Sequence, residues 1–200
     1  MISLDFVRTQ ARAPILHSGE VTLRAAQLTD YPAWAQLRDR SRPHLTRWEP
    51  DWQDKDATVD AFRMRIRTQE RLHRSGAALS LMAFMKSTGE MIGGVTLSDI
   101  RFHASRSATI GYWIGEGHLR KGYGFTSVRL MLDYAFGEKR FNRIEAACQP
   151  GNAASRALLI KAGFREEGFA RDYLFINGSW RDHLLFAVTA RDFCGAPTSI

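Results

Sequence analysis

The sequence predicts a mixed α/β (α+β) fold in which helices flank a central sheet that is mixed but mostly antiparallel. Apolar runs joined by short turns predict the antiparallel hairpins. An amphipathic helical segment between two strand-like segments predicts one parallel crossover. At 200 residues and 44% hydrophobic, the chain can bury a sizeable core. We assign residues 21–190 to a single domain, 1–20 to an N-terminal extension and 191–200 to a C-terminal tail.

The first part of the chain predicts one short strand followed by helices. Residues 21–24 have the apolar alternation of a strand, and Asp30 is a candidate N-cap for a helix over 30–40. Residues 57–74 place apolar side chains at helical spacing, with arginines on the other face. Between them, residues 41–55 are rich in proline and tryptophan and are predicted to be irregular.

Five apolar runs predict a meander and a later hairpin. The meander strands are residues 79–85, 91–100 and 107–114, and the hairpin strands are residues 173–176 and 184–188. The dipeptide Asn177-Gly178 lies between the last two runs and is a strong signal for a tight hairpin turn. Strands joined in this way are antiparallel, so most of the sheet is predicted to be antiparallel.

The segment between these hairpins predicts the parallel crossover. Residues 122–136 carry one apolar stripe and are predicted to be a helix, followed by a strand over 143–148. A second helix over 152–162 ends at Gly163, a residue typical of the position after a helix. The first helix thus connects strand 107–114 to strand 143–148, and the two strands are predicted to be parallel.

A basic glycine loop, residues 119–125, opens the crossover helix. The first N–H groups of a helix are unpaired and carry partial positive charge. Gly122 and Gly124 lack Cβ atoms, so an anion can approach that backbone, and Arg120 and Lys121 add full charges. The loop fits a pyrophosphate site, although a flexible basic loop is an equally good interpretation of it alone. It is neither a Walker loop nor a GxGxxG motif.

A second polar feature begins the next helix. Asn152 is placed to cap this helix with Ser155 in its first turn, and the alternative is that both side chains face a ligand groove. Because this helix follows the parallel strand, its start is expected at the same sheet edge as the glycine loop. The two features together suggest a phosphorylated cofactor that lies between two strands.

The charge and cysteine content narrow the function classes. A net charge of +7 favours anionic partners, namely a phosphorylated cofactor, acidic peptides or nucleic acid. A solvated basic surface is an equally good interpretation of the charge. Zinc-finger, homeodomain and RNP signatures are missing, which disfavours a dedicated nucleic-acid module. Cys148 and Cys194 have no metal-ligand or CxxC spacing and no HxxxH pair occurs, so no metal site is expected.

The N-terminal residues and the hydropathy pattern predict a cytoplasmic protein without a membrane association. Charged and polar side chains interrupt residues 1–18, which disfavours a signal peptide. No 18-residue apolar segment is present. The expected assembly is a monomer or homodimer.

The glycine loop and the run Asn152-x-x-Ser155-x-x-Leu158-x-x-Lys161-x-Gly163-Phe164 resemble the GNAT acetyltransferase superfamily. The second run is similar to the RimJ/RimL-like branch, which acetylates ribosomal proteins. Residues 111–115, 143–146 and 47–50 share that resemblance, and the order of elements agrees from about residue 21 to 188. The family loop usually opens with Gln or Arg followed by Gly, whereas this chain has Leu119 and Arg120.

The resemblance implies acetyl-coenzyme A as the acetyl donor. Its pyrophosphate would lie on the backbone of Arg120, Lys121, Gly122, Tyr123, Gly124 and Phe125. Its pantetheine arm would follow the strand that ends at Ile114, where the family's two parallel strands splay apart. Asn152 would hydrogen-bond the arm, and Ser155 would face the thiol.

The implied reaction is direct attack of a neutral amine on the thioester. The backbone N–H of Ile114 is the candidate donor to the oxyanion. Glu116 and Glu145 are candidate bases acting through water, and each has a simpler interpretation as a solvated or ion-paired side chain. Ser155 is the candidate proton donor to the leaving thiolate. Cys148 is disfavoured as a covalent nucleophile because no histidine partner is near it in sequence.

The acceptor is expected opposite the cofactor, with Trp48, Glu49 and Trp52 as candidate binding residues beside Arg47 and the turn at 177–180. An ordinary packed loop is the alternative for that segment. Three functions remain open: acetylation of a protein N-terminus, plausibly a ribosomal one near RNA; acetylation of a small amine such as an antibiotic, polyamine or amino acid; and a non-catalytic acyl-coenzyme A-binding or RNA-associated module.

Overall fold

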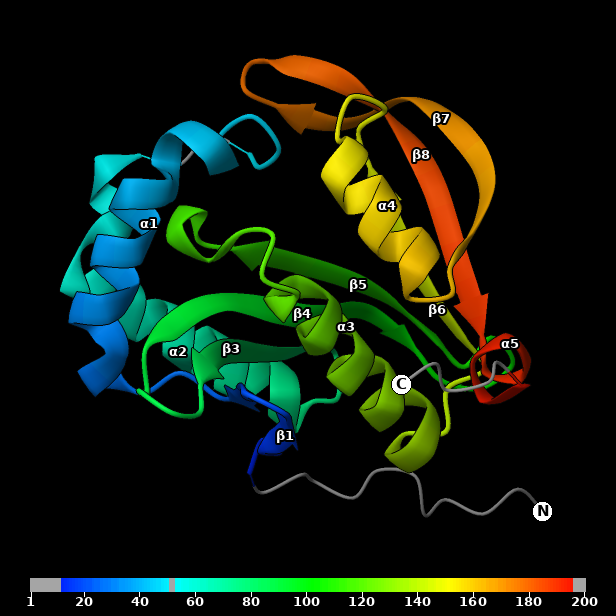
Figure 1. Ribbon diagram of the computed structural model, residues 1–200, viewed down its shortest axis with the longest axis horizontal. Coiled ribbons are helices and arrows are strands. Elements are labelled where there is room, and N and C mark those ends of the chain that lie inside the picture. Colours follow the sequence, from blue (N-terminus) through cyan, green and yellow to red (C-terminus); the bar gives the residue numbers. More distant parts are fainter. Residues whose placement is uncertain (1–11, 51–52, 196–200) are drawn as a thin grey trace.

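The computed structural model describes residues 12–50 and 53–195. Its eight-stranded sheet has the order β1-β2-β3-β4-β5-β6-β8-β7, with helices on both faces (Figure 1). The strands are β1 Leu16–Ser18, β2 Val21–Arg24, β3 Leu79–Met85, β4 Met91–Arg101, β5 Ser107–Ile114, β6 Arg143–Cys148, β7 Arg165–Ile176 and β8 Ser179–Thr189. The helices are α1 Tyr31–Leu45, α2 Val59–Arg74, α3 Tyr123–Asp133, α4 Ala153–Lys161 and α5 Ala190–Gly195, with short turns η1 Leu28–Asp30, η2 Asp54–Ala57, η3 Glu116–His118 and η4 Tyr134–Glu138.

Among the described strands, β5 and β6 are the one parallel pair, and the other neighbouring pairs are antiparallel. The predicted fold class is therefore confirmed. In the described parts of the chain, no helix is both long and apolar enough to cross a bilayer.

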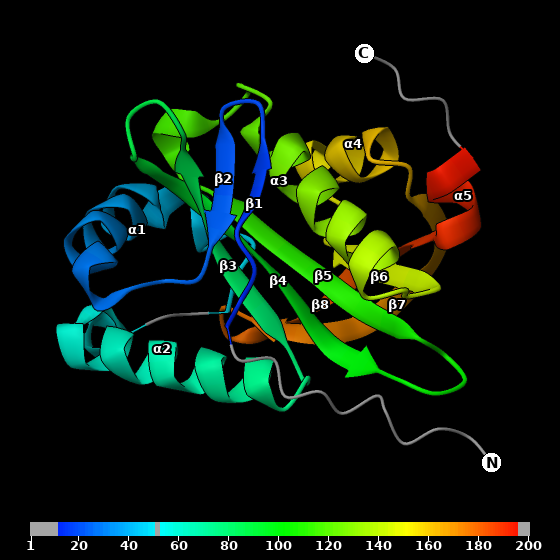
Figure 2. The same cartoon turned by 90° about the horizontal axis from the view of Figure 1, so that it is seen from below.

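Two apolar clusters hold the helices to the sheet. On one face, α3 and α4 pack on the sheet through side chains such as Val128, Met131 and Leu159. On the other face, α1 and α2 cover a smaller cluster that joins Trp34 and Phe62 to strand residues, and Figure 2 shows these helices on the opposite side from α3 and α4. The same strand can contribute side chains to both clusters, because successive side chains point to opposite faces of the sheet.

The parallel pair β5–β6 is short. Its register joins Ser107–Thr109 to Arg143–Glu145 and goes no further. Beyond that point β5 stays paired with β4 as far as Ile114, and β6 stays paired with β8 as far as Cys148. The two strands therefore diverge. We call this divergence the β5–β6 fork, with β5 residues 110–114 on one side and β6 residues 146–148 on the other.

Helix α1 is longer than the sequence predicts. It continues through Pro43 to Leu45, although the segment from residue 41 was expected to be irregular. Leu45 is buried, and the Thr46 N–H donates to the Arg42 carbonyl at 3.0 Å, so the turn after the proline still closes. The burial of Leu45 outweighs the cost of Pro43, because a proline disturbs the hydrogen bonds of only one helical turn.

The last hairpin is also longer than predicted, and its turn is confirmed. Asn177 and Gly178 have φ of 49° and 76°, the left-handed values that a two-residue hairpin turn requires. Strand β7 starts at Arg165 rather than residue 173. The sequence did not predict its first part, residues 165–172, because that part lies at the sheet edge and most of its side chains are charged and exposed. Apolar alternation therefore gave no signal there. Strand β1 and helix α5 also lie outside the predicted elements.

Gly93 provides a test of the close packing between β4 and β5. An ideal Cβ on Gly93 would lie 2.2 Å from the Trp113 carbonyl oxygen and 3.1 Å from the Ile114 Cα. Because the obstacle is backbone, we expect Gly93→Ala to lower the free energy of unfolding by about 3 kcal/mol in denaturant titrations. Gly111→Ala is the matched control, since nothing lies within 4 Å of its ideal Cβ. Equal stability of the two variants would contradict this packing.

Candidate active site

The loop before α3 presents unpaired backbone donors. Gly122 is the N-cap residue of α3 with φ of 83°, and no side chain caps the helix. An ideal Cβ on Gly122 would meet nothing within 4 Å, so the space beside this backbone is open. An uncapped N-terminus of an 11-residue helix, with open space in front of it, fits a pyrophosphate.

The basic residues of this loop adopt a conformation that suits the same role. Arg120 has φ of 60°, the left-handed value that the glycine usual in the family would take without strain. The departure from the family pattern therefore leaves a glycine-like backbone at this position. The Lys121 ammonium donates to the Gly117 carbonyl at 3.0 Å, so its charge is held over the loop.

Gly124 brings the loop against the fork. Its ideal Cβ would lie 3.0 Å from Leu158 Cδ1 on α4 and 3.3 Å from Ile114 Cγ1 on β5. The first turn of α3 therefore contacts both elements at the open end of the fork. Tyr123 and Phe125 flank Gly124 and pack partly buried against the main core.

The backbone of β5 turns donors toward the fork. The Gly115 N–H donates to the Ile92 carbonyl at 2.9 Å, so Gly115 and Ile92 form a hydrogen-bonded pair. In an antiparallel ladder such pairs alternate with pairs whose backbone groups point outward. The register pairs Ile114 with Gly93 and Tyr112 with Val95, so the N–H groups of Ile114 and Tyr112 point away from β4. They point to the side where β6 has already diverged.

Ser155, Tyr112 and Cys148 gather at the same place from three elements. The hydroxyls of Tyr112 and Ser155 are 2.9 Å apart. Burial raises the pKa of Tyr112 to about 12, against a smaller opposing effect of the Ser155 hydrogen bond. Burial also raises the pKa of the Cys148 thiol, which the contact with Ser155 only partly offsets. Cys148 is therefore a neutral thiol, a poor nucleophile, while the two hydroxyls form a protonated pair.

Asn152 caps α4 as predicted. Its side-chain oxygen accepts from the Ser155 N–H at 3.1 Å. The cap places Ser155 in the first turn of α4, at the edge of the sheet where α3 also begins. The two helix starts meet at the fork, as the sequence predicted, and contact of Asn152 with a cofactor arm stays a prediction.

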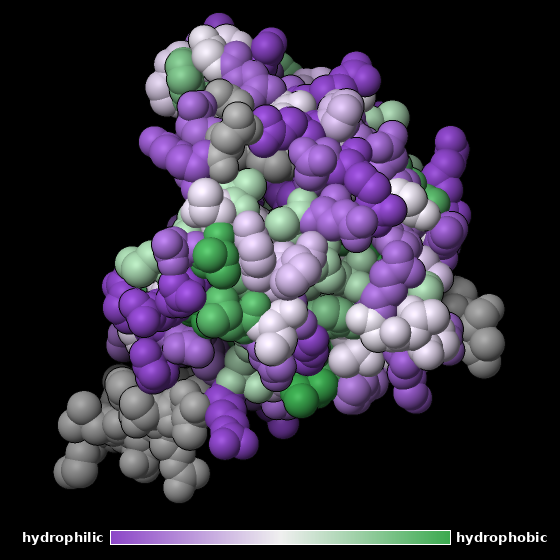
Figure 3. All heavy atoms as spheres, turned by 90° about the vertical axis from the view of Figure 1, so that its left-hand side faces the viewer, coloured by the Kyte–Doolittle hydropathy of each residue, from purple (hydrophilic) through white to green (hydrophobic). Residues whose placement is uncertain are grey.

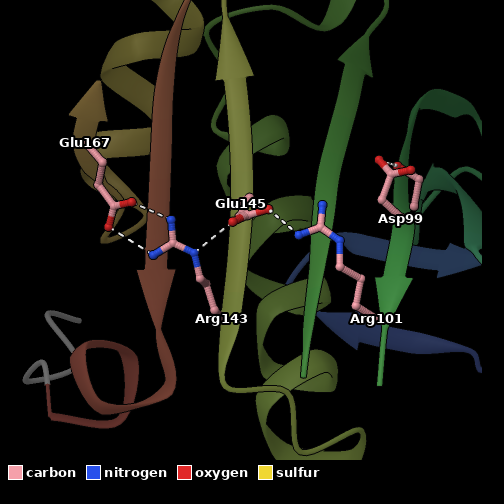
Figure 4. Close-up of polar contacts among 6 residues, drawn as sticks. Asp99, Arg101, Arg143, Glu145 and Glu167 are labelled. Carbon is pink, nitrogen blue, oxygen red and sulfur yellow. Dashed lines mark hydrogen bonds and ion pairs between the residues drawn. The ribbon is translucent and has the colours of Figure 1, made fainter. Parts of the chain in front are cut away.

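The two candidate bases occupy different environments. Glu116 is exposed in η3, and its backbone N–H donates to the buried Ser41 hydroxyl at 3.0 Å. Glu145 is ion-paired instead: Arg143 Nε lies 2.9 Å from one oxygen and Arg101 Nη1 lies 3.6 Å from the other (Figure 4). It projects from the sheet face opposite Ile144 and Cys148, away from Ser155. This geometry does not favour Glu145 as a base.

Glu145 belongs to a row of charges across the closed end of the fork. Arg143 Nη1 also lies 3.0 Å from Glu167 on β7. That hydrogen bond is the main reason why the pKa of Arg143 is raised, and the same bond lowers the pKa of Glu167. The row links β4, β6 and β7 just where β5 and β6 are still paired.

The acceptor candidates Trp48 and Glu49 have different surroundings, and contact of either with an acceptor stays a prediction. Glu49 accepts two hydrogen bonds from the buried Arg38, at 3.1 and 2.7 Å, and the Arg38 guanidinium lies 4.9 Å from the centroid of the Trp113 ring. Glu49 is therefore held in place by Arg38. Trp48 lies 3.9 Å from the ideal Cβ of Gly151. Trp52 lies outside the described residues.

Three segments meet beside the open end of the fork. The Gln149 side chain donates to the Arg47 carbonyl at 3.4 Å, and the Asn177 side-chain amide donates to the Thr46 carbonyl. The chain after α1, the β6–α4 turn and the β7–β8 turn are thus joined. Figure 1 shows the β7–β8 turn reaching over toward the chain that follows α1.

The sequence did not predict that Tyr112, Arg38 and Ser41 contribute to the site. Arg38 and Ser41 follow Trp34 at helical spacing and lie on the buried face of α1, so the period of α1 carried a usable signal for both. Tyr112 lies two residues before Ile114 and therefore faces the same way on β5, but its contact with Ser155 depends on 43 residues of intervening chain.

Comparison with known proteins agrees with this geometry. Residues 20–165 match the family described as the acetyltransferase (GNAT) domain. The probable N-acetyltransferase YjcK of Bacillus subtilis is 35% identical over 179 residues, which cover 89% of this chain and 98% of that protein. The ribosomal protein uS5-alanine N-acetyltransferase of Escherichia coli is 31% identical over 166 residues, covering 82% and 86%. The structure of Mycobacterium smegmatis RimJ in complex with CoA-disulfide gives a TM-score of 0.83 at 33% identity, covering 92% of this chain and 90% of that one.

Gly122→Val should weaken binding of coenzyme A at least tenfold in titration calorimetry. A branched side chain at φ of 83° strains the loop by about 1–2 kcal/mol and fills the open space before α3. Gly137→Val is the control, because Gly137 has no positive φ and no atom within 4 Å of its ideal Cβ. Unchanged affinity of the Gly122 variant would refute the assignment of the pyrophosphate to this loop.

Replacement of Asn152 separates capping from ligand binding. Asn152→Ala should lower the free energy of unfolding by about 1 kcal/mol through loss of the cap. Asn152→Ser keeps a capping oxygen, so we expect it to restore most of that stability in denaturant titrations. Both variants lack the amide donor, and both should bind coenzyme A more weakly. Wild-type affinity in the serine variant would show that Asn152 serves the helix alone.

Proposed function

This chain belongs to the GNAT acetyltransferase family and is an acetyl-coenzyme A-dependent N-acetyltransferase, and we propose that its acceptor is the N-terminal α-amine of a protein. Ribosomal proteins are the first candidates, because the Escherichia coli relative is by name an N-acetyltransferase of ribosomal protein uS5. We place the reaction in the cytoplasm and assign it to one catalytic domain over residues 21–190.

The open sheet face beside the fork carries the proposal of a polypeptide acceptor. Gly111 on β5 is exposed, and nothing lies within 4 Å of its ideal Cβ. Thr96, its partner on β4, and Ser80 on β3 form a partly buried polar pair, with their hydroxyls 3.1 Å apart. An extended chain can lie on such a surface, whereas small-molecule sites are typically concave and mostly enclosed.

The residues around the fork fit the cofactor. The backbone of residues 120–125 would hold the pyrophosphate at the uncapped start of α3. Ile110, Tyr112 and Ile114 lie on the diverged part of β5, where their outward backbone groups can hydrogen-bond a pantetheine arm. When bound, acetyl-coenzyme A supplies the acetyl group as a thioester.

We assign the chemical roles from the same geometry. The Ile114 N–H would donate to the oxygen that becomes negatively charged during attack. Ser155 would donate to the thiol sulfur. Its partner Tyr112, with a pKa of about 12, keeps its own proton at neutral pH and holds the Ser155 hydroxyl in place. Glu116, exposed at the start of η3, is the remaining candidate base through water.

A thiol-release assay with acetyl-coenzyme A tests the acceptor class. N-terminal peptides of the host's ribosomal proteins and a panel of small amines serve as acceptors at matched concentrations. We expect release with one or two peptides, at a kcat/KM well above that of any small amine. Turnover of a small amine as fast as the best peptide would contradict the proposal and identify a metabolic or resistance enzyme.

Ser155→Ala is the control for the assigned chemistry. We expect kcat on the best peptide to fall about 100-fold, with coenzyme A affinity little changed. The helix cap is kept in this variant because Asn152 accepts from the backbone of residue 155. Full activity of the variant would remove Ser155 from the mechanism without affecting the acceptor result.

A further inference from the structure

Helix α2 carries a line of arginines that the acetyl-transfer site does not use. Its 16 residues contain five arginines and no lysine. At 3.6 residues per turn, four of them fall within about 80° of the helix circumference, on the side away from the buried Phe62 and His73. We call these four the arginine stripe: Arg63, Arg67, Arg71 and Arg74.

Among the residues that the structure describes, an ion pair is present at only one arginine of the stripe. Arg63 pairs with Asp60. Within residues 12–50 and 53–195, no ion pair involves Arg67, Arg71 or Arg74, and all three are exposed. Like charges three or four residues apart destabilise a helix by about 0.2–0.5 kcal/mol per pair. Two acidic residues of α2, Asp60 and Glu70, lie on the same side of the helix and offset part of this repulsion. An anionic partner would offset the rest.

The chemistry of the stripe matches a phosphate backbone. Guanidinium groups bind phosphate through paired N–H donors, which a lysine ammonium cannot do. Residues four apart on a helix are separated by about 6 Å along its axis, so the stripe presents donors in a regular row. Hydrophilic side chains occupy much of the molecular face that α1 presents to the viewer in Figure 3, around a smaller apolar area.

A hollow next to the stripe adds a second observation. Its volume is about 470 Å³, and it is open to solvent. Its wall combines apolar and hydrogen-bonding side chains: Ala26, Gln27, Leu28, Ile66 and Glu70, together with Arg63 and Arg67 of the stripe. Apolar side chains in such a wall can contact the ring of an unstacked base, and its polar side chains can hydrogen-bond the base edge.

We propose that the arginine stripe is an RNA-docking surface, on which the backbone of a single-stranded segment lies while one base enters the hollow. A membrane surface fits less well, because the apolar face of α2 is buried on the sheet and cannot insert between lipids. The stripe lies outside the β5–β6 fork, so this inference goes beyond acetyl transfer and does not depend on the acceptor.

Fluorescence anisotropy with a labelled single-stranded RNA tests the proposal. The stripe variant is Arg67→Gln/Arg71→Gln/Arg74→Gln. The control, Lys86→Gln/Arg171→Gln/Arg191→Gln, removes the same charge from exposed positions elsewhere. We expect the salt slope of log Kobs to decrease in magnitude by about 2 in the stripe variant, since each lost phosphate contact on a single strand contributes about 0.7. Affinity at low salt should fall at least tenfold in the stripe variant and much less in the control.

Three results would overturn the inference: no RNA binding by the wild-type protein, equal losses in the stripe and control variants, or loss of binding to phosphatidylserine vesicles while RNA binding is retained. Acetylation of a free peptide is measured for every variant and should be unchanged. Failure of peptide acetylation in the wild type would refute the proposed acceptor and leave the RNA result valid, so the two proposals fail separately.

Discussion

The brief pairing of β5 with β6 is the constraint on which the rest of the structure depends. The two strands share register over three residues each and then separate, and each remains hydrogen-bonded to its outer neighbour. Strand β5 stays hydrogen-bonded to β4, and β6 stays hydrogen-bonded to β8. The sheet can therefore divide between β5 and β6 while each strand keeps one hydrogen-bonded neighbour. The inner edge of β5 is then a row of backbone donors and acceptors without a strand opposite. Helices α3 and α4 begin beside this edge. Backbone groups that can pair with a cofactor and a helix N-terminus that can bind its phosphates therefore lie close together.

The other side of the fork is built from charges that neutralise one another. Arg38 is buried, and a lone buried cation would be costly, so the pair with Glu49 and the Trp113 ring beneath it are needed to hold it there. The same reasoning applies at the closed end of the fork, where Arg143 lies between Glu145 and Glu167. Both arrangements engage a carboxylate, Glu49 or Glu145, that the sequence had indicated as a candidate for substrate contact or catalysis. Glu49, Glu145 and Glu167 are therefore held in ion pairs, whereas Glu116 is exposed and the hydroxyls of Tyr112 and Ser155 lie 2.9 Å apart.

The sequence predicted those features whose geometry depends on a few neighbouring residues. The hairpin at Asn177-Gly178, the cap at Asn152 and the loop at Gly122 each depend on a few consecutive residues, and each has the predicted geometry. The full length of β7 could not be predicted, because an exposed edge strand has no apolar period. Helix α1 passes Pro43 because buried Leu45 outweighs a local penalty. Contacts such as Tyr112–Ser155 and Arg38–Glu49 arise only when the sheet and helices have assembled, and neither spacing nor composition records them.

We propose that β5 offers alternate N–H groups to the cofactor across the fork. Residue-resolved amide hydrogen exchange by NMR, with and without coenzyme A, is the decisive measurement. We expect the amides of Tyr112 and Ile114 to become protected on binding. The amides of Gly111 and Trp113, already paired with β4 by the alternation of the ladder, should change little. Protection that appears at Gly111 and Trp113, or that leaves Tyr112 and Ile114 unchanged, would contradict the proposed arrangement of cofactor and strand.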